Sequence, residues 1–169
     1  MRLAYLTILP SLLALAACGA ADDGKGAAED GVAALSCDPP AFEVGESVEL
    51  APGLTATLLK HGYGRRAEAG DLVDVHYTGW LFDPNAEDNK GSEFDSSRTR
   101  NQAFQFPLGA GRVIPGWDQG VECMMLGEER RLTIAPEMAY GAAGRPPVIP
   151  QSATLVFDVE LLDASAPGD

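Results

Sequence analysis

The sequence lacks most of the residue patterns on which catalytic chemistry usually depends. Its 169 residues include two histidines and three cysteines, with no Cys-x-x-Cys pair. No nucleophile elbow, phosphate-binding glycine loop or His-Glu-x-x-His segment is present. Both histidines, His61 and His76, fall on or beside expected strands and are predicted to face solvent. We therefore expect no hydrolase or transferase chemistry, no metal and no cofactor.

Basic residues are also few. Lys and Arg number 12 against 25 acidic residues, which gives a formal net charge of −13. Nucleic-acid binding needs clustered positive charge, whereas the densest basic groups here are the pairs Arg65-Arg66 and Arg130-Arg131. This balance argues against nucleic acid as a partner. Apolar residues make up 46% of the chain, as in an ordinary globular protein, and the length suits one domain with short extensions.

The long apolar run lies at the N-terminus. Arg2 precedes an apolar stretch over residues 3–15 that Pro10 interrupts, and a membrane-spanning helix would need about 20 apolar residues. The pattern is typical of a signal peptide over residues 1–17. Its end, Leu15-Ala16-Ala17-Cys18, resembles the lipobox of bacterial lipoproteins, in which lipid on the cysteine anchors the protein to a membrane. The alternative is an ordinary secretory signal with Cys18 incidental, and the place of Cys18 directly after the apolar run favours lipidation.

If the protein is exported, export determines which membrane holds it and whether its cysteines are oxidised. Gly19 rather than Asp follows Cys18, which favours the outer membrane, facing the periplasm, over the inner membrane. In an oxidising compartment, Cys37 and Cys123 can form a disulfide. The alternative is that Cys123 is a small buried residue and Cys37 is free, and the sequence leaves both open.

Composition divides the rest of the chain. Residues 18–43 are rich in Ala, Gly and acidic residues and are predicted to be a flexible tether. Residues 44–163 show short alternating runs that predict strands, as at Val73, Val75 and Tyr77. Residues 164–169 form a C-terminal tail. One domain over residues 44–163 is therefore expected.

One helix interrupts the strands. Pro115 suits a first helical position, Trp117 and Val121 recur at helical spacing, and Gly127 is a suitable stop. A single short helix among five or six antiparallel strands predicts an α+β fold in which the sheet curves around the helix.

Two loops stand out between the expected elements. Residues 82–93 are polar and rich in turn residues, which predicts a bulge at a strand junction. Residues 141–151 place an apolar Val-Ile pair among prolines and glycines. A rigid loop that offers apolar side chains is typical of a binding loop.

From about residue 44 to residue 163 the sequence resembles the FKBP family of peptidyl-prolyl isomerases. The segments that carry the resemblance, in family order, are Val75-His76-Tyr77-Thr78-Gly79, Glu93-Phe94-Asp95-Ser96-Ser97-Arg98, Phe104-Gln105-Phe106-Pro107-Leu108-Gly109, Val113-Ile114-Pro115-Gly116-Trp117, Ala139-Tyr140-Gly141 and Ala153-Thr154-Leu155-Val156-Phe157-Asp158-Val159-Glu160-Leu161-Leu162. The resemblance implies an FKBP-like fold, which is a five- to six-stranded antiparallel half-barrel sheet wrapped around one short α-helix. It also implies a hydrophobic pocket that holds proline. It implies catalytic roles for Tyr77, Asp95, Ile114, Trp117, Tyr140 and Phe157. It implies that substrate is also bound by Phe94, Arg100, Phe104, Val113, Val148 and Ile149.

Particular roles follow from the same resemblance. Trp117 would form the floor of the pocket, and the backbone N–H of Ile114 would bind a carbonyl of the substrate. Tyr140 would offer its hydroxyl. Asp95 would be an acid at the pocket edge, hydrogen-bonded to Tyr77 and Arg100. Val148 and Ile149 would cap the pocket from the proline-rich loop.

The resemblance also implies an activity and a class of substrate. It implies isomerisation of X–Pro bonds in exported polypeptides by a monomer, without covalent or acid–base chemistry, and sensitivity to macrolide inhibitors. The alternatives are a lipoprotein adaptor that binds proline-containing peptides with little turnover, or a structural spacer. An intact pocket argues against the spacer. One departure concerns Arg145, which stands where relatives often carry other residues, including His, so a shifted substrate preference is expected.

Overall fold

The computed structural model describes residues 43–166. The predicted signal peptide and nearly all of the predicted tether lie outside these residues, as do Cys18 and Cys37. None of the helices in the described part of the chain is long and apolar enough to span a membrane.

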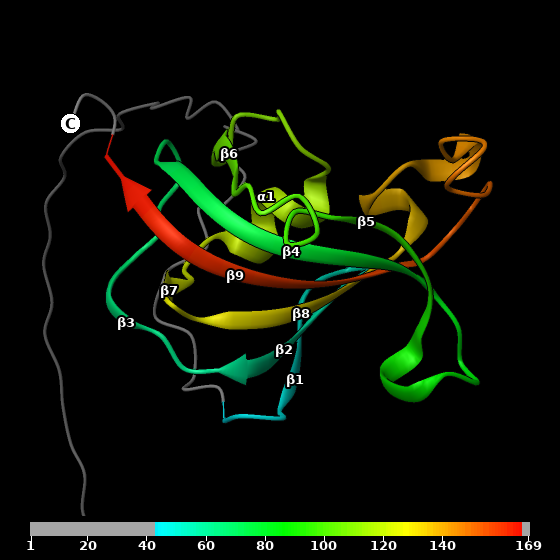
Figure 1. Cartoon of the computed structure of the whole chain (residues 1–169), viewed down its shortest axis with the longest axis horizontal. Coiled ribbons are helices and arrows are strands. Elements are labelled where there is room, and N and C mark those ends of the chain that lie inside the picture. The colour runs from blue at the N-terminus through cyan, green and yellow to red at the C-terminus, as the bar shows by residue number, and fades with distance from the viewer. Residues whose placement is uncertain (1–42, 167–169) are drawn as a thin grey trace, which may run out of the picture. The chain divides into compact units, whose positions relative to one another are not determined.

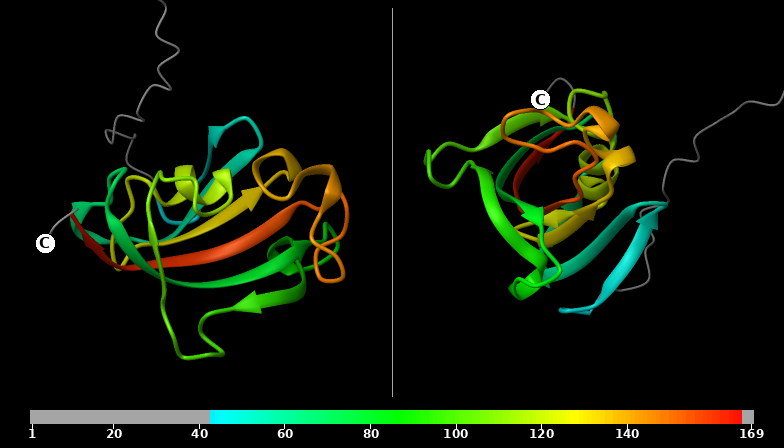
Figure 2. Two further views of the ribbon diagram at one scale, coloured as in Figure 1. Left: turned by 90° about the horizontal axis from the view of Figure 1, so that it is seen from above. Right: turned by 90° about the vertical axis from the view of Figure 1, so that its right-hand side faces the viewer.

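The described residues form a curved antiparallel sheet with a short helix against its inner face (Figures 1 and 2). The strand order is β1-β2-β8-β9-β4-β5. Strand β6 lies off this path and pairs with β4. The strands of this sheet are β1 (Ser47–Ala51), β2 (Leu54–Lys60), β4 (Leu72–Phe82), β5 (Lys90–Ser96), β6 (Phe104–Pro107), β8 (Glu129–Ile134) and β9 (Leu155–Ser165). This arrangement confirms the predicted α+β fold. Strand β9 continues past the predicted domain end at residue 163.

Alternation along the strands explains which side of the sheet becomes the core. In β4, Val73, Val75 and Tyr77 are buried, while Asp74 and His76 lie half-buried on the other face. Successive side chains of a strand point to opposite faces, so β4 contributes every second residue to the core over this stretch. The long β4–β9 ladder forms the centre of the sheet.

Helix α1 (Pro115–Val121) lies unusually close to the sheet. A side-chain carbon at Gly116 would lie 2.5 Å from Ile134, and one at Gly120 would lie 2.6 Å from Leu132. Both glycines are buried and are four residues apart on one helix face. Their missing side chains therefore allow the helix backbone to approach β8.

The helix ends earlier than the sequence predicted. The chain leaves helical geometry at Glu122, and Cys123 adopts a φ of +65°, well before Gly127. The buried guanidinium of Arg130 donates hydrogen bonds to the carbonyls of Gly120, Glu122 and Cys123 at 3.2–3.3 Å. Carbonyls at a helix end need such partners, and Arg130 supplies them from a neighbouring strand.

The loops also differ from expectation in detail. The predicted bulge over residues 82–93 is shorter, because β5 already starts at Lys90 and only a 3-10 turn, η1 (Glu87–Asn89), precedes it. Two further 3-10 turns, η2 (Pro136–Met138) and η3 (Gly141–Ala143), lead into the proline-rich loop. A separate two-stranded sheet, β3 (Tyr63–Arg66) with β7 (Met125–Leu126), was not predicted.

Candidate functional site

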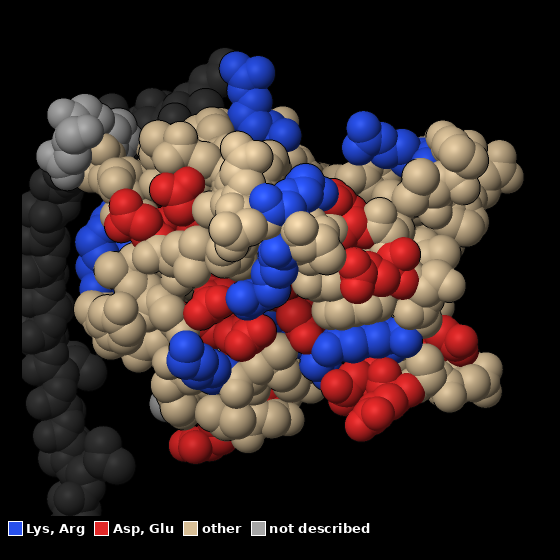
Figure 3. Space-filling model, in the orientation of Figure 1, with Lys and Arg blue, Asp and Glu red and all other residues tan. Residues whose placement is uncertain are grey.

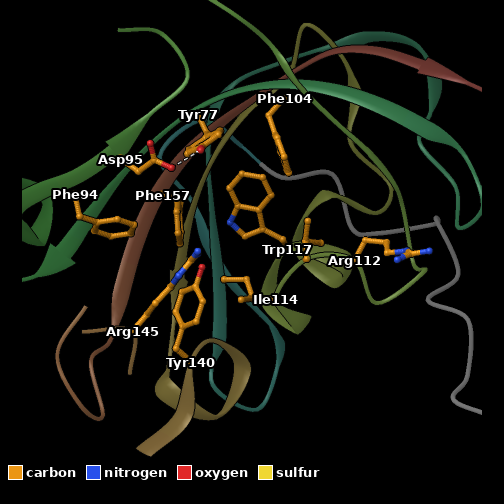
Figure 4. Close-up of a pocket in the computed structure, with 11 residues that line it drawn as sticks. Tyr77, Phe94, Asp95, Phe104, Arg112, Ile114, Trp117, Tyr140, Arg145 and Phe157 are labelled. Carbon is orange, nitrogen blue, oxygen red and sulfur yellow. Dashed lines mark hydrogen bonds between the residues drawn. The ribbon is translucent and has the colours of Figure 1, made fainter. Parts of the chain in front are cut away.

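An open pocket of about 300 Å³ lies between the sheet, the start of α1 and the proline-rich loop (Figure 4). It opens where the curved sheet leaves its inner face uncovered by the helix. Its lining consists mainly of aromatic and aliphatic side chains, with a few polar ones: Tyr77, Phe94, Asp95, Phe104, Arg112, Val113, Ile114, Trp117, Tyr140, Arg145 and Phe157.

Trp117 forms the floor of this pocket from the first turn of α1. Its side chain is 4% exposed. The rings of Tyr77 and Phe157 meet it edge to face, with centroids 4.9 and 5.3 Å from the indole, and Phe104 does so at 6.0 Å. Aromatic rings favour this geometry, so the floor and walls support one another. The pocket is therefore largely formed before any ligand arrives.

Gly79 provides the space in which the aromatic wall packs. It lies on the buried face of β4, and a side-chain carbon there would lie 2.6 Å from the ring of Phe157 and 2.8 Å from that of Phe94. These two rings pack edge to face with centroids 5.5 Å apart. The wall can form this way because residue 79 has no side chain.

A hydrogen-bonded group of three side chains lines one edge of the pocket. The hydroxyl of Tyr77 donates to Asp95 Oδ2 at 2.5 Å, and Arg100 donates to Asp95 Oδ1. Arg100 also donates to the Tyr77 oxygen at 3.1 Å. These are the bonds that the sequence resemblance implied. They hold Tyr77 at a fixed angle against Trp117.

The same bonds fix the charge of this edge. Burial raises the pKa of Asp95, but the hydrogen bonds from Tyr77 and Arg100 outweigh it, so the pKa lies below the usual carboxyl value. For Tyr77, burial and the bond to Asp95 raise the pKa above its ordinary value. At neutral pH the edge therefore holds a carboxylate, a neutral phenol and a guanidinium.

Ser97 supports this edge from behind. It is fully buried, and its hydroxyl accepts a hydrogen bond from the backbone N–H of Tyr77 at 2.8 Å. The same oxygen lies 3.0 Å from His76 Nδ1. His76, which was predicted to face solvent, lies on the outer face of β4 and is half-buried beside Ser97.

Several hydrogen-bond donors at the pocket have no acceptor within residues 43–166. The indole N–H of Trp117 is buried and unpaired. The backbone N–H of Ile114 and the hydroxyl of Tyr140 also donate to no described residue. A buried donor without an acceptor costs about 1–3 kcal/mol. A ligand that presents oxygen atoms would offset part of this cost.

The loop before the helix is held by one carboxylate. Asp118, in the first turn of α1, accepts hydrogen bonds from the backbone N–H groups of Gly109 and Gly111 at 2.9 and 3.0 Å. Both glycines have positive φ, a conformation that other residues adopt at a cost. The closed loop sets the position of Val113 and Ile114 at the pocket wall.

Most of the residues named from the sequence meet in this pocket, and three do not line it. Arg100 contacts it through Asp95 and Tyr77. Val148 and Ile149 line an adjoining cavity of about 350 Å³, which shares Phe94, Asp95, Tyr140 and Arg145 with the main pocket. The predicted cap therefore lies beside the main pocket. Val148 is 51% exposed, whereas Ile149 is 3% exposed.

Two positions that line or shape the pocket were missed. Arg112 directly precedes the segment that carries the resemblance, which starts at Val113, and its charge gave no sign of a pocket position. Gly79 was quoted in a motif but given no role, because the contact it makes possible is between two residues distant in sequence. Arg145 was noted as a departure and lines both cavities.

The arrangement defines the class of protein. An apolar cavity with few polar groups binds a compact apolar group and fixes it by one or two hydrogen bonds. No nucleophile with a neighbouring base lines it. Such a site suits binding of a prolyl ring and catalysis of a rotation rather than of bond cleavage.

Comparisons with known proteins identify the family. The FKBP-type peptidyl-prolyl cis-trans isomerase family matches residues 63–162. FK506-binding protein 1A of Aspergillus fumigatus is 52% identical over 111 residues, covering 65% of this chain and 93% of that protein. Peptidyl-prolyl cis-trans isomerase FKBP4 of Mus musculus is 46% identical over 123 residues, covering 70% of this chain and 25% of that protein. The crystal structure of FkpA from Escherichia coli superposes with a TM-score of 0.62 at 41% identity, covering 73% of this chain and 53% of that one.

The chain belongs to the FKBP-type peptidyl-prolyl cis-trans isomerase family, and it has that activity.

Proposed function

We propose that this isomerase accelerates X–Pro rotation in exported polypeptides while a lipid on Cys18 holds it at a membrane. The observation that best supports the site is the aromatic pocket floored by Trp117, with unpaired hydrogen-bond donors among its lining residues. Support for the location comes from the sequence: an apolar leader over residues 3–15 and the Leu15-Ala16-Ala17-Cys18 string. The residue after Cys18 favours the outer membrane, facing the periplasm.

The mechanism requires no bond between enzyme and substrate. Rotation about an X–Pro amide has a barrier of roughly 18–20 kcal/mol, which comes mainly from amide resonance. The twisted amide carries less charge separation than the planar one, so a dry aromatic pocket stabilises it relative to the ground state. Trp117 and Phe157 hold the prolyl ring while the preceding carbonyl turns.

Polar groups of the pocket would fix the moving chain. The N–H of Ile114 can bind a carbonyl oxygen next to the ring, and the hydroxyl of Tyr140 can bind a second oxygen. Donors that are already positioned lose little freedom when they engage the transition state. The ionised Asp95 serves to orient Tyr77, with no proton transferred.

The activity test uses a short X–Pro peptide and measures catalysed cis-to-trans conversion. Tyr140→Phe removes one hydroxyl and is expected to lower kcat/KM by about 2- to 10-fold, the value of one hydrogen bond. Trp117→Ala and Asp95→Ala are expected to lower it further. Trp80→Ala is a matched control, because Trp80 is the second tryptophan and does not line the pocket. If Trp80→Ala and Trp117→Ala have equal effects on folded protein, the site is elsewhere.

The location test follows the lipid. The chain expressed with its own leader in a bacterium should fractionate with membranes, and mass spectrometry should find acyl groups on Cys18. Cys18→Ser should release the protein from the membrane fraction without changing kcat/KM. An unmodified Cys18 in the mature chain would remove the anchor from the proposal and leave the isomerase.

The same pocket suggests an inhibitor class. Relatives at 52% identity are named FK506-binding proteins. We infer that this pocket binds macrolides of that type, and calorimetry with the folded protein would detect it. An absence of binding would overturn this inference.

An adaptor that binds proline-containing peptides with little turnover is the alternative. It predicts measurable peptide affinity together with a catalysed rate close to the uncatalysed one. The peptide assay therefore separates the two functions directly.

A further inference from the structure

Almost every basic side chain between residues 43 and 166 has a partner. Arg66 donates to a backbone carbonyl. Ion pairs with carboxylates are formed by Lys60, Arg65, Lys90, Arg98, Arg100, Arg130 and Arg131. The face in Figure 3 shows the same pattern, with many of its blue groups beside red ones. The exceptions are Arg112 and Arg145, whose side chains make no ion pair or hydrogen bond with any described residue.

Both unpaired arginines lie at the isomerase pocket. Arg145 also lines the adjoining cavity, so it stands where the two meet. Figure 4 shows its guanidinium beside the ring of Tyr140, directed into the pocket, while Arg112 lies on the other side of Trp117 and points outward. A chain bound with its proline over Trp117 would pass close to Arg145.

The backbone of Arg145 is firmly held although its side chain is exposed. Its N–H donates to the carbonyl of Ile149 at 2.9 Å, and its own carbonyl accepts from the N–H groups of Val148 and Ile149 at 3.2 and 3.0 Å. Gly144, at φ +63°, packs against the backbone of Pro150. The loop therefore presents the guanidinium from a fixed base, which lowers the entropic cost of using it in binding.

The positive charge of the two arginines is not neutralised by carboxylates that line the pocket. Asp95 is the sole carboxylate residue that lines either cavity within the described chain. It is already bonded to Tyr77 and Arg100. A cleft lined by charge of one sign attracts the opposite sign, and a guanidinium binds a carboxylate through two parallel hydrogen bonds. The site is thus locally basic in a chain whose net charge is −13.

We propose that Arg145, assisted by the field of Arg112, selects polypeptides that carry an Asp or Glu side chain next to the isomerised proline. This inference rests on the proposed function, because it names a substrate class for the same pocket. The net negative charge of the chain disfavours acidic segments elsewhere, whereas the two arginines at the pocket offer them a local site of opposite sign.

The test uses peptides that differ at one position. One set carries Glu, Gln or Lys directly before proline, and a second set carries them directly after it. For at least one set, kcat/KM at low ionic strength should be about two- to fivefold higher for Glu than for Gln, the range for an exposed ion pair, and lowest for Lys. Near 1 M salt, where the screening length falls to about 3 Å, the preference should shrink.

Variants assign the preference to the arginines. Arg145→Gln should bring the Glu-to-Gln ratio close to one, Arg145→Glu should reverse the order of Glu and Lys, and Arg112→Gln should reduce the ratio by a smaller factor. Lys60→Gln removes the same charge away from the pocket and should leave the ratio intact. Rates with the Gln peptides show whether each variant is folded and active.

Each outcome decides between the claims. Equal rates for Glu and Gln peptides in the wild type, or a Glu preference that survives Arg145→Gln, would overturn the selection of acidic substrates and leave the isomerase standing. Failure to accelerate any peptide would instead overturn the proposed function.

Discussion

At the scale of single residues, Asp95 and Tyr77 determine how the pocket responds to pH. The pKa of Asp95 lies below the ordinary 3.8, and that of Tyr77 lies above the ordinary 10.0. The stability that ionised Asp95 contributes is present above its unfolded-state pKa and is lost as pH falls through the lower folded-state value. The stability from neutral Tyr77 is present below its unfolded-state pKa and is lost as pH rises through the higher folded-state value.

We therefore expect kcat/KM for a neutral X–Pro peptide to be flat from about pH 5 to about pH 9, since no group of the mechanism titrates there. Stopped-flow assays across this range check it. A bell-shaped profile centred near pH 7 would contradict a mechanism without proton transfer. Asp95→Asn should remove the change in stability on the acid side that belongs to this residue.

Gly79 is the residue whose substitution should damage the pocket most directly. In Gly79→Ala the new methyl group would meet the rings of Phe157 and Phe94. Overpacking of this kind costs about 1–3 kcal/mol, and the displaced rings should also lower kcat/KM. Thermal unfolding and the peptide assay measure the two effects. Because Phe94→Leu removes one of the two rings, the double variant should be destabilised by less than the sum of the single changes.

Some of these residues could be identified from the sequence, and the roles of others could not. Motif order identified Tyr77, Asp95 and Trp117, because each stands in a string that the family shares. Gly79 and Ser97 stand in the same strings, yet their roles depend on contacts between distant strands that no local pattern records. The placement of Val148 beside the main pocket depends on the path of the loop backbone.

At the scale of elements, the proline-rich loop depends on Gly144. A side-chain carbon there would lie 2.3 Å from the carbonyl oxygen of Pro150, and φ is +63°. Gly144→Ala should therefore lose both stability and catalytic efficiency. Gly64→Ala is the matched control, because Gly64 has a φ of +77° with no atom within 4 Å of the added carbon.

The two variants should differ in their effect on catalysis. Gly64→Ala is expected to cost about 1–2 kcal/mol of unfolding free energy, from the left-handed backbone alone, with kcat/KM preserved. Gly144→Ala should cost more and lower kcat/KM, because a backbone clash cannot be relieved by rotating a side chain. Denaturant unfolding and the peptide assay give both quantities. Equal effects on activity would contradict a role for the loop in the site.

Helix α1 shows how far an element can be predicted. Pro115 marked its start correctly, because its signal is local. Its end was placed too late, since Gly127 is a common stop but the helix carbonyls are instead bound by Arg130 from β8. A helix end fixed by a distant side chain leaves no trace in the adjacent sequence.

At the scale of the whole molecule, the feature to test is the disulfide of Cys123. The partner of Cys123 lies outside the described residues, so pairing with Cys37 stays a prediction. If lipid occupies Cys18, Cys37 is the remaining cysteine. A loop of the length that separates residues 37 and 123 would contribute up to about 4.6 kcal/mol by restricting the unfolded chain.

We expect Cys37→Ser to expose a titratable thiol at Cys123 and to lower the unfolding temperature, while Cys18→Ser does neither. Thiol counting without reductant, together with peptide mapping, measures this. A Cys18→Ser variant that frees Cys123 would assign the disulfide to Cys18 and remove the lipid from the proposal.

The sheet was predicted well because its strands alternate strongly, as in β4 and β9. The small β3–β7 sheet was not, because β7 has two residues and β3 is largely exposed. Such short strands exist through pairing between distant parts of the chain, and periodicity cannot reveal them.

The two tryptophans of this protein can report on occupancy of the pocket. Trp117 has a buried indole N–H without an acceptor among the described residues, at the place where a ligand sits. Trp80 lies half-buried on the opposite face of β4, with the Lys90 ammonium 4.5 Å from its ring centroid. In a ¹⁵N-labelled sample the two indole resonances would therefore act as a sensor and a reference, and occupancy of the pocket could be read from one relative to the other without any added probe.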